Sequence, residues 1–350
     1  MNPAEPRTAP TTTLTRRRLL AAGATAALAT ACGVPDSGGS TTGLKAATYL
    51  TPAYKDLFPS FGILLDGIKK ASGGKVTFQL FHSESLLDAD QLIPGLLQGV
   101  TDLGFQTSSY ISTTYKVLGA YELPFVSEGV EAQQRALRPD GELYKVFNEE
   151  LGKKGLRVIG SMPTSFETIW TVDKPIRKPE DIKGMRIRTA GHVEGETVRA
   201  LGGSPVSMSS AELFQALERG TIDGMISYLG TIFSRDLQQV IRYATMGRFG
   251  SYSLDAYVRK RWYDQLDDAG KQALLTAGKE YLEKGTANQI KVHKEQYEPA
   301  LDKAGIEVIE PKGAELAAFE DALKPVEQRW RNQLGDPALA DKALGLVRNA

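Results

Sequence analysis

The sequence has a single cysteine and only three histidines in 350 residues. One cysteine cannot form an internal disulfide or a thiolate zinc site. The histidines, His82, His192 and His293, lie far apart, and none belongs to a paired metal-binding motif. These scarcities argue against metal-dependent or histidine-based catalysis, so we expect no metal site, no cofactor and no catalytic residues.

The sequence also lacks an excess of charge of either sign. Lys and Arg together number 42, and so do Asp and Glu. Removing residues 1–31, as argued below, takes away four arginines and one glutamate and leaves a net charge of −3. A mildly acidic chain has no electrostatic footprint for nucleic acid, so we expect no nucleic-acid partner.

A long hydrophobic run is missing as well. The most apolar stretch near the start, residues 19–31, has thirteen uncharged residues. A membrane-spanning helix needs roughly 20. A basic start at residues 16–18 followed by this short apolar run and small residues is typical of an export signal. We therefore expect residues 1–31 to be an export signal rather than a transmembrane segment.

Cys32 follows this signal and is our candidate for lipid attachment. The paired arginines resemble a twin-arginine export signal, and residues 29–32 resemble a lipoprotein cleavage box, although Ala29 stands where an aliphatic residue is usual. The alternative is an incidental thiol. Residues 32–43 are rich in Gly, Ser and Thr and predict a flexible tether behind the lipidated cysteine. The protein would then be exported and anchored to the outer face of the cytoplasmic membrane, or be periplasmic.

The remaining chain is longer than a single core usually holds, which favours two lobes. Periodicity predicts strands at residues 44–51, 75–81 and 101–106, with helices at 56–71 and 88–97 between them. That order makes a parallel sheet with helices on its faces, and ligands of such sheets bind at the carboxyl ends of the strands. Further predicted strands are 155–162 and 168–172, and further predicted helices are 266–297 and 313–334.

Residues 178–224 have the pattern of a site for a small anion: a strand carrying an arginine, a loop, a capped helix and another strand. Residues 185–189 alternate, so Arg186 and Arg188 share one face. We interpret Arg186 as a solvent-facing charge. Arg188 ends the strand just before a loop, so we interpret it as the residue that binds the anion.

The helix after this loop has a recognisable start. Ser209 and Glu212 fit a capping box, with Ser210 between them. The positive end of the helix would strengthen the field at Arg188 only if the loop at residues 202–208 turned it towards the cleft.

Five segments resemble, in order and spacing, the DctP family of extracytoplasmic solute receptors, the binding subunits of tripartite ATP-independent periplasmic (TRAP) transporters. The segments are GGKVTFQLFHSESLLDADQLIPGLLQGVTDLGF, ELPFV, KPIRKPEDIKGMRIRTAG, ALGGSPVSM with GTIDG, and LDDAGKQALL. The resemblance runs over residues 44–334 and implies a type II-like, two-lobe α/β periplasmic-binding-protein fold. Its hinged lobes would be joined by crossing strands and a long helix.

The resemblance also implies the domain boundaries and the partners. Lobe 1 would comprise residues 44–165 and 254–293, and lobe 2 residues 166–253 and 294–350. The receptor would close over a small organic acid and hand it to membrane permease subunits driven by an ion gradient. We expect a monomer whose lipid anchor is its only attachment to the membrane.

Arg188 stands where most members of the family have the arginine that pairs with the ligand's carboxylate. A guanidinium matches a carboxylate through two parallel hydrogen bonds. Thr168 stands where many members have a second arginine, so we expect a monocarboxylate, such as an oxo, hydroxy or aromatic acid. The other candidate ligand-binding residues are Tyr49, Phe105, Thr107, Phe166, Glu167, Trp170, Ser210, Ser227 and Tyr228.

Other functions stay open at this point. An ABC-type solute receptor also binds its ligand between two lobes, and a ligand-sensing receptor would bind a solute as well. Glu167, if it pointed into the cleft, would favour an acid that carries an amino group, whereas an outward-facing surface acid fits its pattern equally well. An enzyme using Ser209, Ser210, Asp223 or Glu167 would need a base, and none stands at a recognisable spacing from those serines. We therefore expect a receptor and not an enzyme.

Overall fold

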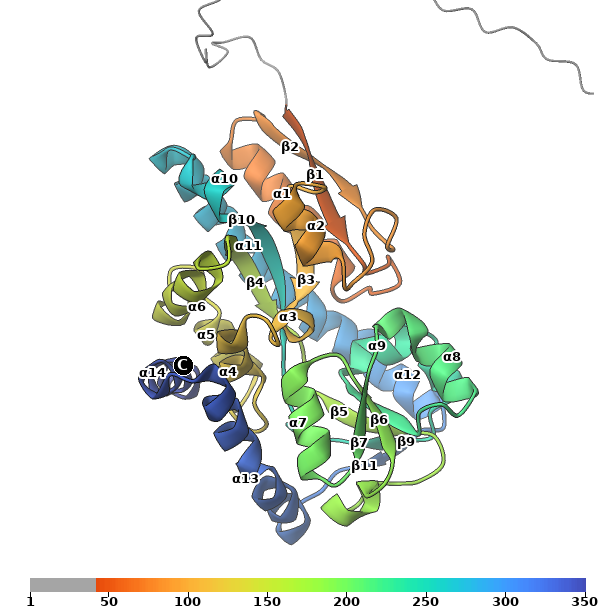
Figure 1. Cartoon of the computed structure of the whole chain (residues 1–350). Coiled ribbons are helices and arrows are strands. Elements are labelled where there is room, and N and C mark those ends of the chain that lie inside the picture. Colours follow the sequence, from red (N-terminus) through yellow and green to blue (C-terminus); the bar gives the residue numbers. More distant parts are fainter. Residues whose placement is uncertain (1–41) are drawn as a thin grey trace, which may run out of the picture. The chain divides into compact units, whose positions relative to one another are not determined.

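The computed structural model describes residues 42–350 (Figure 1). The predicted export signal at residues 1–31, Cys32 and the predicted tether as far as residue 41 lie outside the described residues. Two mixed β-sheets, each flanked by helices, make up the described part. We call the half built on the first sheet lobe 1 and the half built on the second sheet lobe 2. The described chain therefore has the two-lobe α/β architecture that the resemblance implies.

Lobe 1 contains a five-stranded sheet in the order β2-β1-β3-β10-β4. β1 pairs in parallel with β2 and β3, which confirms the arrangement expected from their strand–helix–strand order. β10 runs antiparallel between β3 and β4. The strands are β1 (Thr42–Thr48), β2 (Val76–Phe81), β3 (Leu103–Thr107), β4 (Leu156–Pro163) and β10 (Ser253–Arg259).

The helices of lobe 1 surround this sheet. They are α1 (Phe58–Ala71), α2 (Leu92–Gln98), α3 (Ser108–Ile111), α4 (Gly119–Glu122), α5 (Val130–Ala136), α6 (Glu142–Gly152) and α10 (Lys260–Asp264), with a 3-10 turn at Lys116–Leu118. α1 and α2 begin later than the periodicity predicted, because hydrogen-bonded turns occupy the residues just before them. One such turn holds Tyr54.

Lobe 2 contains a six-stranded sheet in the order β11-β9-β5-β8-β6-β7. β6 pairs in parallel with β7 and β8, while β5 runs antiparallel to β8 and β9. The strands are β5 (Thr168–Thr171), β6 (Arg186–Thr189), β7 (Ser204–Ser207), β8 (Gly224–Ser227), β9 (Tyr243–Thr245) and β11 (Glu307–Ile309). The helices are α7 (His192–Ala200), α8 (Leu213–Glu218) and α9 (Leu229–Ser234), with 3-10 turns at Pro179–Ile182, Ser210–Glu212 and Leu237–Gln239.

Two paired segments and one long helix connect the lobes. The segment between β4 and β5 runs beside the segment between β9 and β10: the Thr164 amide donates to the Tyr252 carbonyl, and the Glu167 amide donates to the Gly250 carbonyl, both at 3.0 Å. The long helix α11 (Asp268–Val292) packs on α1 and β4 (Figure 1). It continues through a π-helical turn, His293–Tyr297, into α12 (Glu298–Lys303).

The last helix returns to lobe 1. α13 (Ala314–Leu334) packs against α7 of lobe 2, whereas α14 (Pro337–Arg348) contacts α4, α5 and α6 (Figure 1). The apolar stripe of α14, which includes Ala340, Leu344 and Val347, is buried there. The Arg135 side chain also donates to the Ala350 carbonyl at 3.1 Å. The sequence prediction assigned residues 294–350 as a whole to lobe 2, and α14 departs from it because its buried stripe completes the core beside the lobe 1 helices.

Within residues 42–350, none of the helices combines the length and apolar composition of a membrane span. The same residues contain no group of three or more His, Cys, Asp or Glu side chains placed to hold a metal ion.

Candidate ligand-binding site

A small cavity lies between residues of the two lobes, with Arg188 in its wall. The chain just after β1 and after β3 supplies the lobe 1 side, as expected for the carboxyl ends of parallel strands. The lining residues are Tyr49, Leu50, Tyr54, Leu57, Thr107, Ser109, Tyr110, Arg188, Ala190, Ser210, Ser227, Tyr228, Thr231 and Tyr252. The cavity volume is about 10 Å³, room for about one water molecule. A bound organic acid would therefore require some of the lining side chains to move aside.

Arg188 is buried, with 2% of its surface exposed, and its hydrogen bonds reach both lobes. Its Nε donates to the Met208 carbonyl of lobe 2 at 2.9 Å, and its Nη2 donates to the Tyr110 hydroxyl of lobe 1 at 3.1 Å. In the described part of the chain, no carboxylate lies within salt-bridge distance of it. Its charge is therefore not directly paired.

The surroundings of Arg188 keep it charged. Burial works against its charged form, but the nearby Tyr110 and Glu194 outweigh that effect, and the pKa of Arg188 is raised. Burial also raises the pKa of Tyr110, so its phenol keeps its proton at neutral pH. The site thus presents a permanent cation beside a neutral hydroxyl group.

A second arginine, Arg235, stands behind the cavity wall. Its Nη2 donates to Ser210 Oγ at 3.1 Å, and its Nε donates to the Tyr54 hydroxyl at 3.2 Å. Both partners line the cavity, although Arg235 itself does not. The sequence prediction missed this residue because nothing in the pattern around the short helix α9 signals that it approaches the site.

The structure brings some of the predicted site residues together at the cavity. Those in its wall are Tyr49, Thr107, Arg188, Ser210, Ser227 and Tyr228. The hydroxyl groups of Tyr49 and Thr107 lie 3.3 Å apart, and Ser227 Oγ donates to Thr231 Oγ1 at 2.9 Å. The candidates that do not line the cavity are Phe105, Phe166, Glu167, Thr168 and Trp170.

Phe105 and Trp170 belong to the cores of their lobes instead. Phe105 is fully buried and its ring lies 4.4 Å from that of Phe61, because it sits two residues down β3 from Thr107, under α1 and α11. Trp170 is also fully buried and donates through Nε1 to the Ser227 carbonyl at 2.9 Å, so it supports the cavity wall from behind.

Thr168 and Phe166 are two residues apart in the chain but face different surroundings. Thr168 is buried opposite Ser227 in the sheet, with its hydroxyl 3.4 Å from the Met246 sulfur. Phe166 is half-buried in the crossing segment before β5. Neither side chain reaches the cavity wall.

Glu167 is 1% exposed and packs behind the site, against Gly250. Burial, with the neighbouring carboxyls of Glu194 and Glu122, raises its pKa well above the usual range. Glu194, whose Oε2 accepts from the Ala190 amide at 2.6 Å, is also buried, and its pKa is raised too. Glu167 is therefore neither an outward surface acid nor a cavity-lining carboxylate.

The predicted capping box is formed only in part. Ser209 Oγ accepts from the Ala211 amide at 3.0 Å, but Glu212 makes no return contact to the cap, and the first turn is a 3-10 turn. Arg186 behaves as predicted: its side chain is half-exposed and forms an ion pair with Asp223 at 2.6 Å.

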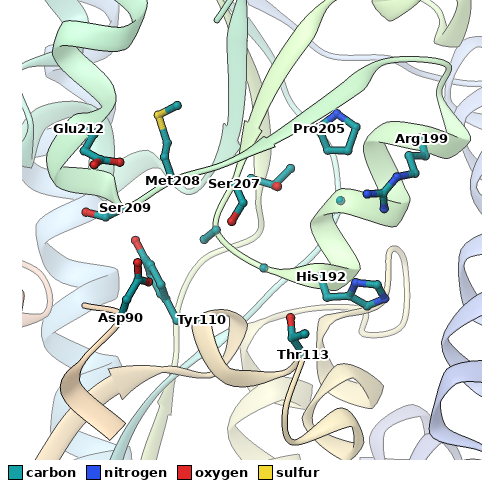
Figure 2. A pocket seen from close by; sticks show the side chains of 14 residues that line it. Asp90, Tyr110, Thr113, His192, Arg199, Pro205, Ser207, Met208, Ser209 and Glu212 are labelled. Carbon is teal, nitrogen blue, oxygen red and sulfur yellow. The ribbon is translucent and has the colours of Figure 1, made fainter. Parts of the chain in front are cut away.

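A larger pocket of about 470 Å³ adjoins the cavity and shares Tyr110 and Ala190 with it. Figure 2 shows side chains of both lobes around this pocket, with Asp90, Tyr110 and Thr113 opposite residues of lobe 2. Those lobe 2 residues include His192, Arg199, Ser207 and Ser209. Tyr110 therefore stands in the wall between the pocket and Arg188.

The model of the DctP family, described as bacterial extracellular solute-binding protein family 7, matches residues 51–333. The chain belongs to this family. Family 7 relatives include the 2,3-diketo-L-gulonate-binding periplasmic protein YiaO of Escherichia coli, 24% identical over 262 residues, 74% of this chain and 77% of that protein. The C4-dicarboxylate-binding periplasmic protein DctP of Rhodobacter capsulatus is 25% identical over 279 residues, 78% of this chain and 81% of that protein.

A solved structure agrees with this membership of family 7. The TRAP periplasmic solute-binding protein of Ralstonia eutropha with bound (S)-2-acetolactate is 27% identical, with a TM-score of 0.76. The likeness covers 88% of this chain and 99% of that chain. The fold of this chain is thus that of TRAP periplasmic solute-binding proteins.

Among the cavity residues that sequence reasoning missed, Tyr54 comes from a turn after β1 and Tyr110 from the short helix α3 that follows β3. Their position just beyond the carboxyl ends of parallel strands was the available signal. Tyr252 offered no such signal, because it comes from the crossing segment before β10.

Proposed function

We propose that the chain is an extracytoplasmic receptor that binds a small organic acid with one carboxylate between its lobes and delivers it to TRAP membrane subunits. The observation that carries this proposal is the state of Arg188: a buried guanidinium without a direct carboxylate partner, hydrogen-bonded to both lobes. Burying a cation without a counter-ion costs free energy, and an anionic ligand would offset that cost.

A single carboxylate fits the cations of the site. Arg188 is the arginine in the cavity wall, whereas Arg235 is held behind Tyr54 and Ser210. Thr168, where many family members have a second arginine, is turned towards Met246. The relatives' names include both monocarboxylates and C4-dicarboxylates. Family membership therefore does not decide how many carboxylates the ligand has, and the choice of one rests on the residues of the site.

The hydroxyl groups of the wall support an oxo or hydroxy acid. Tyr49, Thr107, Ser210, Ser227 and Tyr228 all bring hydroxyls to the cavity. Such groups pair with ligand oxygens, and a site built to do so discriminates strongly against analogues that lack them. The ligand bound to the Ralstonia eutropha protein, (S)-2-acetolactate, has one carboxylate with a hydroxyl and an oxo group.

The remaining parts of the proposal concern location and mode of action. The receptor would be exported by the signal at residues 1–31, lipid-anchored through Cys32 and active as a monomer. It would open by movement about the two crossing segments and α11. It would bind its ligand without turnover, since Ser209 caps the Ala211 amide and the Ser210 hydroxyl already accepts from Arg235.

Neither alternative receptor class gains support from the site. An ABC-type receptor is disfavoured by the match to family 7. An acid with an amino group would need a carboxylate in the wall, and Glu167 packs behind it.

The test is a ligand screen by thermal shift, together with native mass spectrometry of whatever copurifies with the protein. A ligand that binds the folded state raises its unfolding temperature. We expect at least one small monocarboxylate to stabilise the wild type and to have no effect on Arg188→Ala. Stabilisation by dicarboxylates alone would refute the single-carboxylate assignment, and unchanged calorimetric affinity in Arg188→Ala would refute the site.

A further inference from the structure

Two hydroxyl groups in the cavity wall have their acceptor positions already filled. Ser210 Oγ accepts from Arg235 Nη2 at 3.1 Å and from the Tyr54 hydroxyl at 3.3 Å. The Tyr110 oxygen accepts from Arg188 Nη2 at 3.1 Å and from the Ser210 amide at 2.9 Å. A hydroxyl group has two acceptor lone pairs and one hydrogen. Each of these groups is therefore left with a hydrogen to donate.

Neither of these two hydroxyls can accept the hydrogen of the other. The Ser210 and Tyr110 hydroxyls are close enough to interact, but each oxygen already accepts two hydrogen bonds and has no free lone pair for the other. Among residues 42–350, neither hydroxyl donates to any further acceptor. Since burial raises the pKa of Tyr110, its phenol stays protonated and remains a donor.

A third hydroxyl in the wall is without a partner in the described residues. Tyr228 lines the cavity, is 1% exposed, and its oxygen has no hydrogen-bond partner in the part of the chain that the structure describes. Burial also raises its pKa, so this phenol too can donate. With the N–H groups of Arg188, the Ser210 and Tyr110 hydroxyls make this part of the wall a group of donors.

We propose that this cavity selects a carboxylic acid whose neighbouring oxygen can only accept hydrogen bonds, a 2-oxo acid over the corresponding 2-hydroxy acid. This inference rests on the proposed receptor function and narrows its ligand class. The carboxylate pairs with Arg188, and the carbonyl oxygen takes the hydrogens of Ser210 and Tyr110. A ligand hydroxyl or ammonium group in that place would face the Ser210 and Tyr110 donors with hydrogens of its own. One buried hydrogen would then have no acceptor at this position.

Arg235 acts here as a positioning residue. It does not line the cavity, but by donating to Ser210 Oγ it fills an acceptor lone pair and fixes that hydroxyl as a donor. Its second bond, to Tyr54, holds the other group that donates to Ser210. Removing Arg235 frees the Ser210 oxygen to accept, so a ligand hydroxyl would then be tolerated.

The experiment is calorimetry of the full chain with three matched pairs: pyruvate and lactate, 2-oxobutanoate and 2-hydroxybutanoate, and phenylpyruvate and phenyllactate. For the pair that fits the cavity, we expect the oxo acid to bind roughly tenfold more tightly, because one buried donor or acceptor goes unpaired in the hydroxy acid. Ser210→Ala and Arg235→Gln should bring the two affinities within about twofold of each other. Arg219→Gln, which removes an exposed arginine from the same lobe, should leave the ratio unchanged.

The ratio of the two affinities separates this role from a merely structural one. A loosened interface between the lobes would weaken the binding of the oxo acid and of the hydroxy acid equally. Arg235→Lys keeps a donor near Ser210 and should retain part of the preference. If Arg235→Gln does not fold, as judged by circular dichroism, Ser210→Ala decides the question.

The outcomes also distinguish the two proposals. Equal or tighter binding of the hydroxy acids, or a preference that persists in both variants, overturns the inference and leaves the receptor function intact. If the protein binds other carboxylic acids but none of the six acids in the three pairs, the inference is again overturned and the receptor function remains. Absence of binding to any carboxylic acid, in these pairs and in the wider screen, overturns the receptor function itself.

Discussion

Gly191 of lobe 2 lies directly against the backbone carbonyl of Ser109 in lobe 1. A β-carbon at position 191 would lie 2.4 Å from the Ser109 oxygen. Gly191 precedes α7 with a φ of −130°, which any residue can adopt. The glycine is therefore required by the close approach of the two lobes and not by its own backbone conformation.

Gly191→Ala should prevent the lobes from reaching this arrangement. The added methyl group meets backbone on the opposite lobe, which cannot move aside as a flexible side chain would. We expect ligand affinity to fall by about tenfold or more, equivalent to at least ~1.4 kcal/mol, while the unfolding temperature of the ligand-free protein stays near that of the wild type. Calorimetry and thermal unfolding measure the two effects. Gly345→Ala, which meets nothing within 4 Å, is the control, and equal affinity in both variants would show that binding does not need this contact.

Arg188→Lys keeps the charge but removes the planar fork of donors. A lysine at this position cannot reach the Met208 carbonyl, the Tyr110 hydroxyl and a ligand carboxylate together, as the guanidinium can. We expect affinity for the best ligand of the screen to fall at least tenfold, with Arg188→Ala losing about 3 to 5 kcal/mol. Isothermal calorimetry checks both values. A lysine variant with wild-type affinity would mean that charge alone, and not two-pronged pairing, holds the ligand.

Glu122 should make the stability of the protein depend on pH. Burial raises the pKa of its carboxyl from 4.5 to about 8, despite hydrogen bonds from Ser108 and Ser112. Between those values the folded protein holds a proton that the unfolded chain releases, so the free energy of unfolding falls as pH rises from about 5 to 8. The fall should be on the order of 2 to 4 kcal/mol.

Glu122→Gln should reduce this dependence, because a neutral amide replaces one of the titrating groups, while the buried carboxyls of Glu167 and Glu194, whose pKa values are also raised, still contribute. Urea denaturation at pH 5 and pH 8 gives the comparison. Glu128→Gln, an exposed position on the same lobe, should follow the wild type. Asp255, whose pKa burial raises to about 6, adds a smaller loss over the lower part of the same range. A wild type equally stable at both pH values would contradict the burial of an ionisable Glu122.

Cys32→Ala tests the proposed membrane anchor. If Cys32 carries the lipid, the wild type should be found in the membrane fraction and the variant in the soluble periplasmic or secreted fraction. Fractionation followed by immunoblotting, with mass spectrometry of the mature N-terminus, measures the difference. Identical distributions of the two proteins would leave the anchor without support.

Much of the fold could be predicted from sequence where one physical signal dominates. β2 alternates between apolar and polar residues, and its predicted span, residues 75–81, differs from the observed Val76–Phe81 by one residue. Arg188 was singled out because it ends a strand before a loop and stands at the arginine position of the family motif, and the structure places it in the cavity wall. Helix starts were less accurate, since hydrogen-bonded turns precede α1 and α2 and periodicity alone does not mark where a turn becomes a helix.

The rest of the site depends on tertiary placement. Phe105 and Thr107 share a face of β3, yet only Thr107 reaches the cavity, because two residues along a strand separate the rim of the sheet from its covered core. Arg235 and Tyr54 lie far apart in the chain, yet they bond to each other and both bond to Ser210 when the lobes are together. A local sequence pattern cannot predict hydrogen bonds between residues that are so far apart in the chain.

The return of α14 to lobe 1 has a consequence for biosynthesis. The first sheet needs β10, which is made after most of lobe 2, and the helices beside it need the final residues up to Ala350. The core of lobe 1 therefore cannot be completed until these late segments have been made, and folding depends on contacts between segments distant in the chain. A truncation before residue 337 would leave the apolar surface of α4, α5 and α6 bare, and such nascent chains are natural clients for chaperones.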